Sequence, residues 1–226
     1  YLRKNGIDYI KHFHITIIHF IGFLLLAVIV FMDLLLPIVK DFTFVPFIVL
    51  LGFFIIDFLV CYLANKYLIK PVALIKKHPG EYFLRMDYRY VISKSFELMF
   101  QQVLIIILVL LLNNEGINFR WIVFSFAFLF GMIHIPTFRI NGKFFGSYYT
   151  VASIFSAFVF PYLILEIHYG FLYSYIVHWF FYTVSGVFFW ITYKKKSPRK
   201  SSITRLYHII FVYKHSYDGM NKRIHN

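Results

Sequence analysis

Charge and cysteine are both scarce in this chain of 226 residues. Only 15% of the residues are charged, and 10 acidic residues stand against 23 lysines and arginines. The single cysteine, Cys61, excludes a disulfide scaffold and a cysteine-rich metal site. The low charge also excludes an ordinary soluble domain, in which about 25% of the residues are charged.

Hydrophobic residues make up 60% of the chain, including 30 Phe and 18 Tyr. A helix that crosses a membrane needs about 20 mostly apolar residues, and six runs meet this requirement. The predicted spans cover about residues 14–37, 43–64, 91–112, 120–137, 147–166 and 170–193. None of these runs alternates with the period of two that a barrel strand requires. The sequence therefore predicts an all-α polytopic membrane protein with about six transmembrane helices.

The basic residues predict the orientation of these spans. Of the 23 lysines and arginines, 21 lie in the N-terminal segment, the second and fourth connections and the C-terminal tail. Only Lys40 and Arg120 fall on the other side. Cytoplasmic segments of membrane proteins carry such an excess, so we expect both termini in the cytoplasm. Because topology accounts for the positive charge, no nucleic-acid partner is expected.

The chain divides into a membrane domain and a tail. Residues 1–193 are predicted to form a single integral membrane domain. The tail, 194–226, carries nine basic residues against Asp218 alone. Its apolar residues recur at helical spacing, which predicts a segment on the anionic cytoplasmic leaflet, in contact with membrane lipids. The basic stretch 66–89 is expected to lie on the same surface.

Several polar residues fall within the predicted spans, where ionisable groups are costly and usually functional. Asp57 lies deep in the second span, and we expect it to pair with a side chain of another helix. Ser153 and Ser156 are expected to serve helix packing.

The third, fourth and sixth spans carry a more specific group. Glu97 and Gln101 are four residues apart, so they lie one above the other on the same helix face. His134 lies near the cytoplasmic end of the fourth span, at a similar depth. His178 and Tyr182 are again four residues apart. A carboxylate and two imidazoles would each be costly alone in the membrane, whereas together they can share protons and hydrogen bonds.

The depth of His178 sets a geometric condition on this group. Helical rise places His178 about 22 Å from the cytoplasmic end of its span, deeper than Glu97 and His134. The span must therefore tilt, break or be shorter for the three side chains to meet.

The chemistry predicted for this group is the activation of water. A buried carboxylate can accept a proton, and a neighbouring histidine can orient the same water molecule. Two histidines and a glutamate can also bind zinc, but the His-Glu-x-x-His spacing of zinc proteases is absent. We therefore expect no cofactor. Proton handling and a purely structural polar cluster remain alternatives.

Three segments resemble the motifs of a family of intramembrane proteases, which includes the CAAX prenyl endopeptidases and the bacteriocin-processing Abi proteins, together called CPBP proteases. The family pattern is Glu-Glu-x-x-x-Arg, then Phe-x-x-x-His, then His-x-x-x-Asn or Asp. Here Glu97-Leu98-Met99-Phe100-Gln101 resembles the first element, Phe130-x-x-x-His134 matches the second, and His178-x-x-x-Tyr182 resembles the third. The resemblance covers about residues 91–190, in the family's order.

The resemblance implies a peptide hydrolase whose site opens towards the cytoplasm. Glu97 and His134 would activate water, while His178, assisted by Tyr182 or Gln101, would stabilise the oxyanion. A peptide or a lipidated peptide would be the substrate. The chain departs from the family at three positions: Phe96 replaces the first glutamate, Gln101 the arginine, and Tyr182 the final Asn or Asp.

These departures leave a second hypothesis from another class. A relative that has lost catalysis would act as a non-enzymatic membrane scaffold or regulator, with Phe96 filling the polar cavity. A proton-coupled carrier is a third hypothesis, although the outer halves of the spans carry few ionisable residues to form a route. The abundance of Ile, Phe, Tyr, Lys and Asn is typical of a prokaryotic plasma membrane protein.

Overall fold

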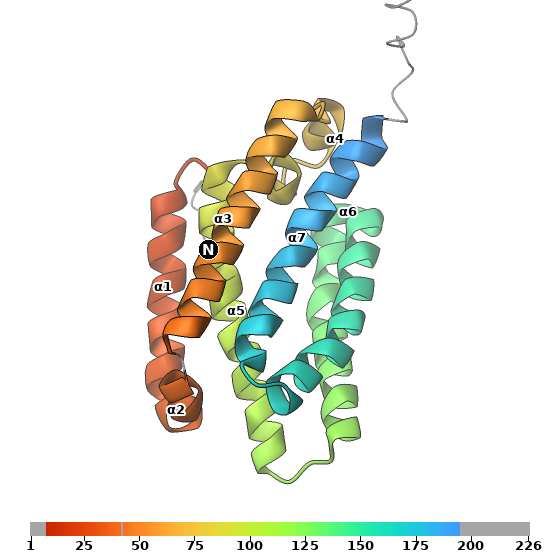
Figure 1. Ribbon diagram of the computed structural model, residues 1–226. Helices are drawn as coiled ribbons and strands as arrows, with labels where there is room; N and C mark the ends of the chain where they lie inside the picture. The colour runs from red at the N-terminus through yellow and green to blue at the C-terminus, as the bar shows by residue number, and fades with distance from the viewer. Residues whose placement is uncertain (1–7, 42, 195–226) are drawn as a thin grey trace, which may run out of the picture.

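A computed structural model of the protein describes residues 8–41 and 43–194, and this part of the chain is helical and contains no strand (Figure 1). The elements are α1 (Phe13–Val30), α2 (Met32–Asp41), α3 (Phe44–Tyr67), α4 (Val72–Lys77), the 3-10 helix η2 (Tyr82–Arg85), α5 (Tyr88–Asn114), α6 (Phe119–Glu166) and α7 (Gly170–Lys194). The predicted membrane-surface tail lies beyond the described residues.

Helix α5 lies at the centre of the bundle, where it contacts α1, α2, α3, α6 and α7 (Figure 1). It begins after Asp87, whose carboxylate accepts a hydrogen bond from the backbone N–H of Arg89 and so caps the helix. Leu98 and Val109 of α5 have no exposed surface. Because four other long elements pack around α5, its polar residues are held away from lipid.

The outer surface of the bundle is apolar. Ile18, Phe124 and Phe155 are more than two-thirds exposed, as are many other large hydrophobic side chains. Such an extended apolar surface is not tolerated in water. Five helices, namely α1, α3, α5, α6 and α7, are long and apolar enough to cross a membrane. The chain is therefore an all-α polytopic integral membrane protein, as the sequence predicts.

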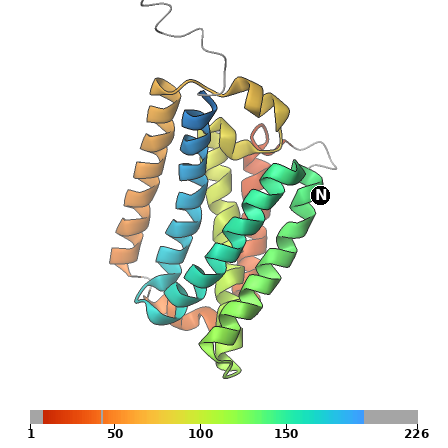
Figure 2. The ribbon, with the colours of Figure 1, turned by 90° about the vertical axis from the view of Figure 1, so that its right-hand side faces the viewer.

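Helix α6 folds back on itself at Gly142. Its 48 residues would extend about 72 Å if straight, more than twice the roughly 30 Å of a hydrocarbon core. Gly142 has φ 81° and ψ 169°, a conformation that side chains disfavour, and this break creates two antiparallel legs (Figure 2). The legs contain the predicted spans 120–137 and 147–166. Six crossings and cytoplasmic termini remain predictions.

The first predicted span, 14–37, is not one continuous helix. The helical path breaks at Phe31, and α2 begins at the next residue. Asp33 lies in the first turn of α2, where the helix dipole favours a carboxylate and so promotes a new helix start. Pro37 then lies inside α2. The sequence prediction missed this break because the apolar run continues through it.

The connection 68–87 does not lie wholly on the membrane surface, contrary to the expectation for 66–89. Phe83 and Leu84 of η2 are buried in the bundle core. Trp190 of α7 donates a hydrogen bond to the Leu84 carbonyl at 2.6 Å. Aromatic packing of Phe83 against Phe189 adds to this anchor. The connection therefore folds down over the end of the bundle and contributes side chains to its interior.

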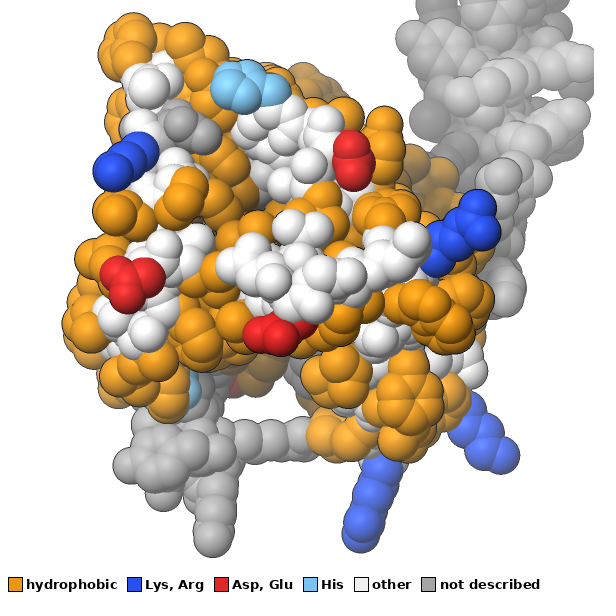
Figure 3. All heavy atoms as spheres, turned by 90° about the horizontal axis from the view of Figure 1, so that it is seen from below, with side chains coloured by type: hydrophobic (Ala, Val, Ile, Leu, Met, Phe, Trp, Pro, Cys, Tyr) orange, Lys and Arg blue, Asp and Glu red, His pale blue; other side chains and the backbone are white. Residues whose placement is uncertain are grey.

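The opposite end of the molecule carries α2, the α5–α6 connection and the α6–α7 turn, at the bottom of Figure 1, and hydrophobic side chains cover much of the face seen from below (Figure 3). Lys40 and Arg120 are the exposed basic residues near this end, beside the exposed Glu115 and Glu166. The α4 end instead carries four exposed lysines, Lys66, Lys70, Lys76 and Lys77. The two ends thus differ in charge in the sense that the positive-inside rule uses.

The turn between α6 and α7 is tight. Tyr169 has φ 57°, and the Gly170 N–H donates to the Ile167 carbonyl at 2.8 Å. A Cβ atom at Gly170 would lie 1.5 Å from the Leu163 carbonyl oxygen. Only glycine fits this position, because any side chain would collide with the backbone of α6.

Candidate functional site

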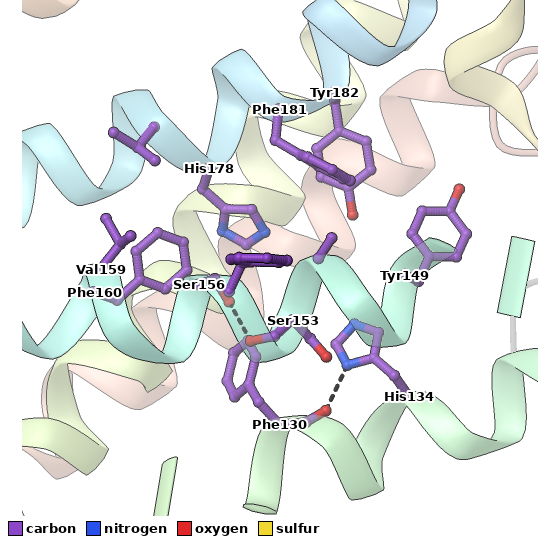
Figure 4. Close-up of a pocket in the computed structure, with 13 residues that line it drawn as sticks. Phe130, His134, Tyr149, Ser153, Ser156, Val159, Phe160, His178, Phe181 and Tyr182 are labelled. Atoms are coloured by element: carbon purple, nitrogen blue, oxygen red, sulfur yellow. Dashed lines mark hydrogen bonds between the residues drawn. The ribbon is translucent and has the colours of Figure 1, made fainter. Parts of the chain in front are cut away.

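Two neighbouring cavities lie at the meeting of α5, α6 and α7. The polar cavity, of about 300 Å³, is lined by charged and aromatic side chains, among them Glu81, Lys94, Glu97 and Tyr90. The apolar cavity, of about 320 Å³, is lined mainly by phenylalanine and valine, together with His178 (Figure 4). The two cavities share the lining residues His134, Tyr149 and Tyr182.

His134 is held by its own helix. Its Nδ1 atom lies 2.6 Å from the Phe130 carbonyl oxygen, one turn earlier in α6 (Figure 4). A carbonyl can only accept, so Nδ1 carries the hydrogen and the neutral ring has its free lone pair on Nε2. The Phe-x-x-x-His spacing therefore has a structural meaning here, since it fixes the tautomer of the histidine.

The tautomer of His178 is fixed by a longer chain of hydrogen bonds. Ser174 donates to the Phe171 carbonyl at 2.9 Å, so its oxygen must accept from the Gln102 Nε2 atom, 2.7 Å away. The amide oxygen of Gln102 then faces His178 Nδ1 at 3.3 Å. His178 therefore donates from Nδ1 and directs an unprotonated Nε2 to the apolar cavity. Both imidazoles offer the cavity wall an acceptor.

Glu97 is fully engaged by its neighbours. Lys94 and Gln101 donate to Oε1 at 2.6 and 3.0 Å, and Tyr9 donates to Oε2 at 2.5 Å. The predicted pairing of Glu97 with Gln101 is thus confirmed. Burial and the neighbouring carboxylate raise the pKa of Tyr9, so this phenol remains protonated as the donor. Glu97 therefore anchors the segment before α1 onto α5.

Lys94 is buried within the bundle with 8% of its surface exposed. Besides its ion pair with Glu97, its Nζ atom lies 4.3 Å from the ring centroid of Tyr182. A cation over a tyrosine face is stabilised by the ring quadrupole, especially when water is excluded. Lys94 thus ties α5 to α7 beside the polar cavity.

Glu81 is a carboxylate of the polar cavity that the sequence analysis missed. It lies between α4 and η2 with 4% of its surface exposed. Tyr149, from the second leg of α6, donates to its Oε2 atom. Within the described part of the chain, Oε1 is buried and has no hydrogen-bond partner. Burial raises the pKa of Glu81, while Tyr149 and Lys94 oppose that shift.

The predicted site residues are therefore distributed over two cavities. Glu97 and His134 line the polar cavity, whereas His178 lines the apolar cavity with His134. Tyr182, one turn nearer the η2 end than His178, lines both. The greater depth of His178 accounts for this separation, since it lies only eight residues into α7. Gln101 lines neither cavity, and it is linked to the polar cavity by its hydrogen bond to Glu97.

Phe96, at the position of the family's first glutamate, is not among the residues that line either cavity in the described structure. Neighbouring residues on a helix project about 100° apart, so Glu97 faces the polar cavity while Phe96 is turned away. Within residues 8–41 and 43–194, no group of three His, Cys, Asp or Glu side chains is placed to hold a metal ion.

Two other polar groups behave as structural residues. Asp57 is buried in α3, and Thr183 of α7 donates to its Oδ1 atom, which confirms the expected partner on another helix. Ser153 and Ser156 donate to carbonyls of their own helix, at 2.8 and 2.7 Å (Figure 4). The hydroxyl hydrogens of both serines are thereby used in α6, although the side chains also line the apolar cavity.

Comparison with protein-family models, with curated proteins and with solved structures finds no match to this chain. The fold is that of a polytopic membrane protein, and histidine, tyrosine and carboxylate side chains line its two adjoining cavities.

Proposed function

We propose that the protein is an intramembrane endopeptidase that uses water to cleave a membrane-associated peptide. The observation that carries this proposal is the pair of histidines, whose Nδ1 atoms are both engaged. Each ring therefore presents an unprotonated Nε2 to the cavities (Figure 4). Such an acceptor can hold one hydrogen of a water molecule, which leaves the second hydrogen for a nearby carboxylate to accept.

The reaction would be an ordinary peptide hydrolysis. Oxygen of the held water attacks the scissile carbonyl carbon, and its proton passes to a carboxylate of the polar cavity, the part that the sequence analysis assigns to Glu97. His178 offers an acceptor in its observed tautomer, so it holds water, and the Tyr182 hydroxyl serves as the oxyanion donor. The same proton then reaches the leaving amine as the carbon–nitrogen bond breaks.

The family resemblance supports the same reaction class. The motif elements around Glu97, His134 and His178 come from α5, the first leg of α6 and α7. Glu97 lines the polar cavity, His178 the apolar cavity and His134 both. We therefore propose a divergent member of the CAAX-protease-like family. The polar cavity is bordered by Gly80 and Tyr82 at the base-rich end, which favours access from the cytoplasm.

The proposal also includes the membrane in which the protein lies and the partners that it binds. Six crossings and two cytoplasmic termini fit the charge distribution, and the residue usage fits a prokaryotic plasma membrane. A peptide or lipidated peptide would enter between the helices, and the basic residues would contact the anionic leaflet.

A second candidate function is a non-enzymatic membrane scaffold. The observation that favours it is the saturation of Glu97, whose two oxygens accept three hydrogen bonds, one of which is the ion pair with Lys94. A carboxylate with this set of partners is well suited to joining helices, and poorly suited to accepting a proton from water.

The test is hydrolysis by the purified protein in proteoliposomes made with H₂¹⁸O. A synthetic library of hydrophobic and lipidated peptides is added, and mass spectrometry detects ¹⁸O in new carboxyl termini. We expect incorporation with the unaltered protein and a loss of about 10²–10⁴-fold in His134→Ala. Ser156→Ala is the matched cavity control. Absence of ¹⁸O with every peptide, or equal rates in His134→Ala, would support the scaffold instead.

A further inference from the structure

The polar cavity contains two carboxylates with opposite surroundings. Glu97 has every oxygen paired, and one of its partners is the Lys94 ammonium. Glu81 has a single hydrogen bond, from Tyr149 to Oε2, and its buried Oε1 lacks a partner in the described structure. An unpaired buried carboxylate oxygen costs free energy and calls for an explanation, of which a catalytic role is one. Asp57 also has an unpaired oxygen, Oδ2, but of these two carboxylates only Glu81 lines a cavity together with a histidine.

The position of Glu81 is fixed by several contacts. Its N–H donates to the His78 carbonyl at 3.1 Å, and the Leu84 N–H donates to the Glu81 carbonyl at 3.2 Å. The adjoining 3-10 helix is anchored to α7 through Trp190. Glu81 is therefore held rigidly at the cavity, which it lines together with His134.

The charged and titratable groups around Glu81 come from every neighbouring element. They are Tyr90, Lys94 and Glu97 of α5, His134 and Tyr149 of α6, Tyr182 of α7, Tyr82 of η2 and Tyr9 before α1. The Lys94 ammonium forms its ion pair with Glu97. It acts on Glu81 through its charge, without a hydrogen bond between the two side chains. Tyr149 is the one group of this set that donates to the Glu81 carboxylate.

We propose that Glu81, rather than Glu97, is the catalytic residue that takes the proton from the attacking water. This assignment rests on the proposed endopeptidase function. Water held at His134 Nε2 gives its proton to Glu81 Oε1 as its oxygen bonds to the scissile carbon. Glu81 then returns the proton to the leaving nitrogen. Tyr149 is a positioning residue, because it holds Oε2 and leaves Oε1 for the proton.

The assignment makes the reaction depend on pH through Glu81. The base is active when ionised, so activity is present above the pKa of Glu81 and is lost as pH falls through it. Burial raises this pKa, so the loss occurs at a higher pH than for an ordinary glutamate. Removal of the Tyr149 hydroxyl removes a donor that favours the charged form. The acid limb of Tyr149→Phe should therefore move to higher pH.

The experiment compares two isosteric variants in the ¹⁸O assay, Glu81→Gln and Glu97→Gln. We expect Glu81→Gln to lose about 10²–10⁴-fold of the rate, as for a general base, while Glu97→Gln retains the acid limb of the pH profile. Glu81→Asp should recover part of the rate, and Tyr149→Phe should shift the limb. These two variants keep the test valid if Glu81→Gln folds poorly.

The outcomes separate this assignment from the function on which it rests. If the unaltered protein incorporates no ¹⁸O, the endopeptidase proposal is overturned. If the unaltered protein is active and Glu81→Gln matches it in rate and pH profile, the assignment of Glu81 alone is overturned. A normal limb in Tyr149→Phe would also overturn it, because the positioning contact would then have no effect on the proton acceptor.

Discussion

The two cavities share three lining residues, yet their polar groups are arranged differently. In the polar cavity, both oxygens of Glu97 are paired, by Lys94, Gln101 and Tyr9, whereas Glu81 is paired at Oε2 alone. In the apolar cavity, the Nδ1 atoms of His134 and His178 each have one hydrogen-bond partner, and the hydroxyl hydrogens of Ser153 and Ser156 are used within α6. The comparison shows that a polar group can stabilise the bundle when all its atoms are paired. A group left half-paired is available for chemistry.

The largest effect should come from breaking the buried ion pair of the polar cavity. Lys94→Met leaves Glu97 buried without its cation, which typically costs about 3–5 kcal/mol of folding free energy. Thermal unfolding in detergent, followed by circular dichroism, measures this loss. The double variant with Glu97→Gln should recover part of the stability, because it removes the orphaned charge. If Lys94→Met and the unaltered protein unfold at the same temperature, the ion pair does not stabilise the fold.

A smaller effect should follow from changing the support of the apolar cavity. Gln102→Leu removes the acceptor for His178 Nδ1 and the donor to Ser174, which should cost about 1–3 kcal/mol. The tautomer of His178 is then no longer fixed. ¹⁵N NMR of the protein labelled at histidine should then show a mixture of the two tautomers of His178, protonated at Nδ1 or at Nε2. An unchanged spectrum would mean that Gln102 does not fix the ring.

The smallest effect is expected at a cavity residue whose hydroxyl hydrogen is already used. Ser156 lines the apolar cavity but donates to the Ser153 carbonyl within its own helix. Ser156→Ala should therefore change the unfolding temperature and the rate of ¹⁸O incorporation very little, since such back-bonding adds little helix stability. A large loss of rate with normal unfolding would place this hydroxyl in the chemistry.

Much of the fold follows from local patterns in the sequence. Apolar runs predict the long helices because burial in lipid depends on composition and length. The breaks at Phe31 and Gly142 have weaker local signals. Gly142 lies between two basic residues in a connection, so a turn was expected there, whereas Phe31 lies within a continuous apolar run.

The candidate site could be predicted in part. Contacts four residues apart, such as Glu97 with Gln101, follow from helical periodicity. The bond between Glu81 and Tyr149 joins residues 68 positions apart, and Gln102 and His178 are separated by 76. Such pairs depend on how the helices pack, which no local pattern specifies. Glu81 was also hidden in a basic connection that was expected to lie on the membrane surface.

The tight turn at Gly170 determines which residues of α7 can reach the cavities. One extra residue between α6 and α7 would rotate every later side chain by about 100° and move it about 1.5 Å along the axis. His178 and Tyr182 would then leave the cavity walls, although both helices would remain intact. The same rotation would move Trp179 and Trp190 out of the core, so a change in chain length at this turn should abolish the site and lower the stability of the bundle. The exposed α5–α6 connection, around Glu115 and Gly116, is the better place for a tag or reporter insertion.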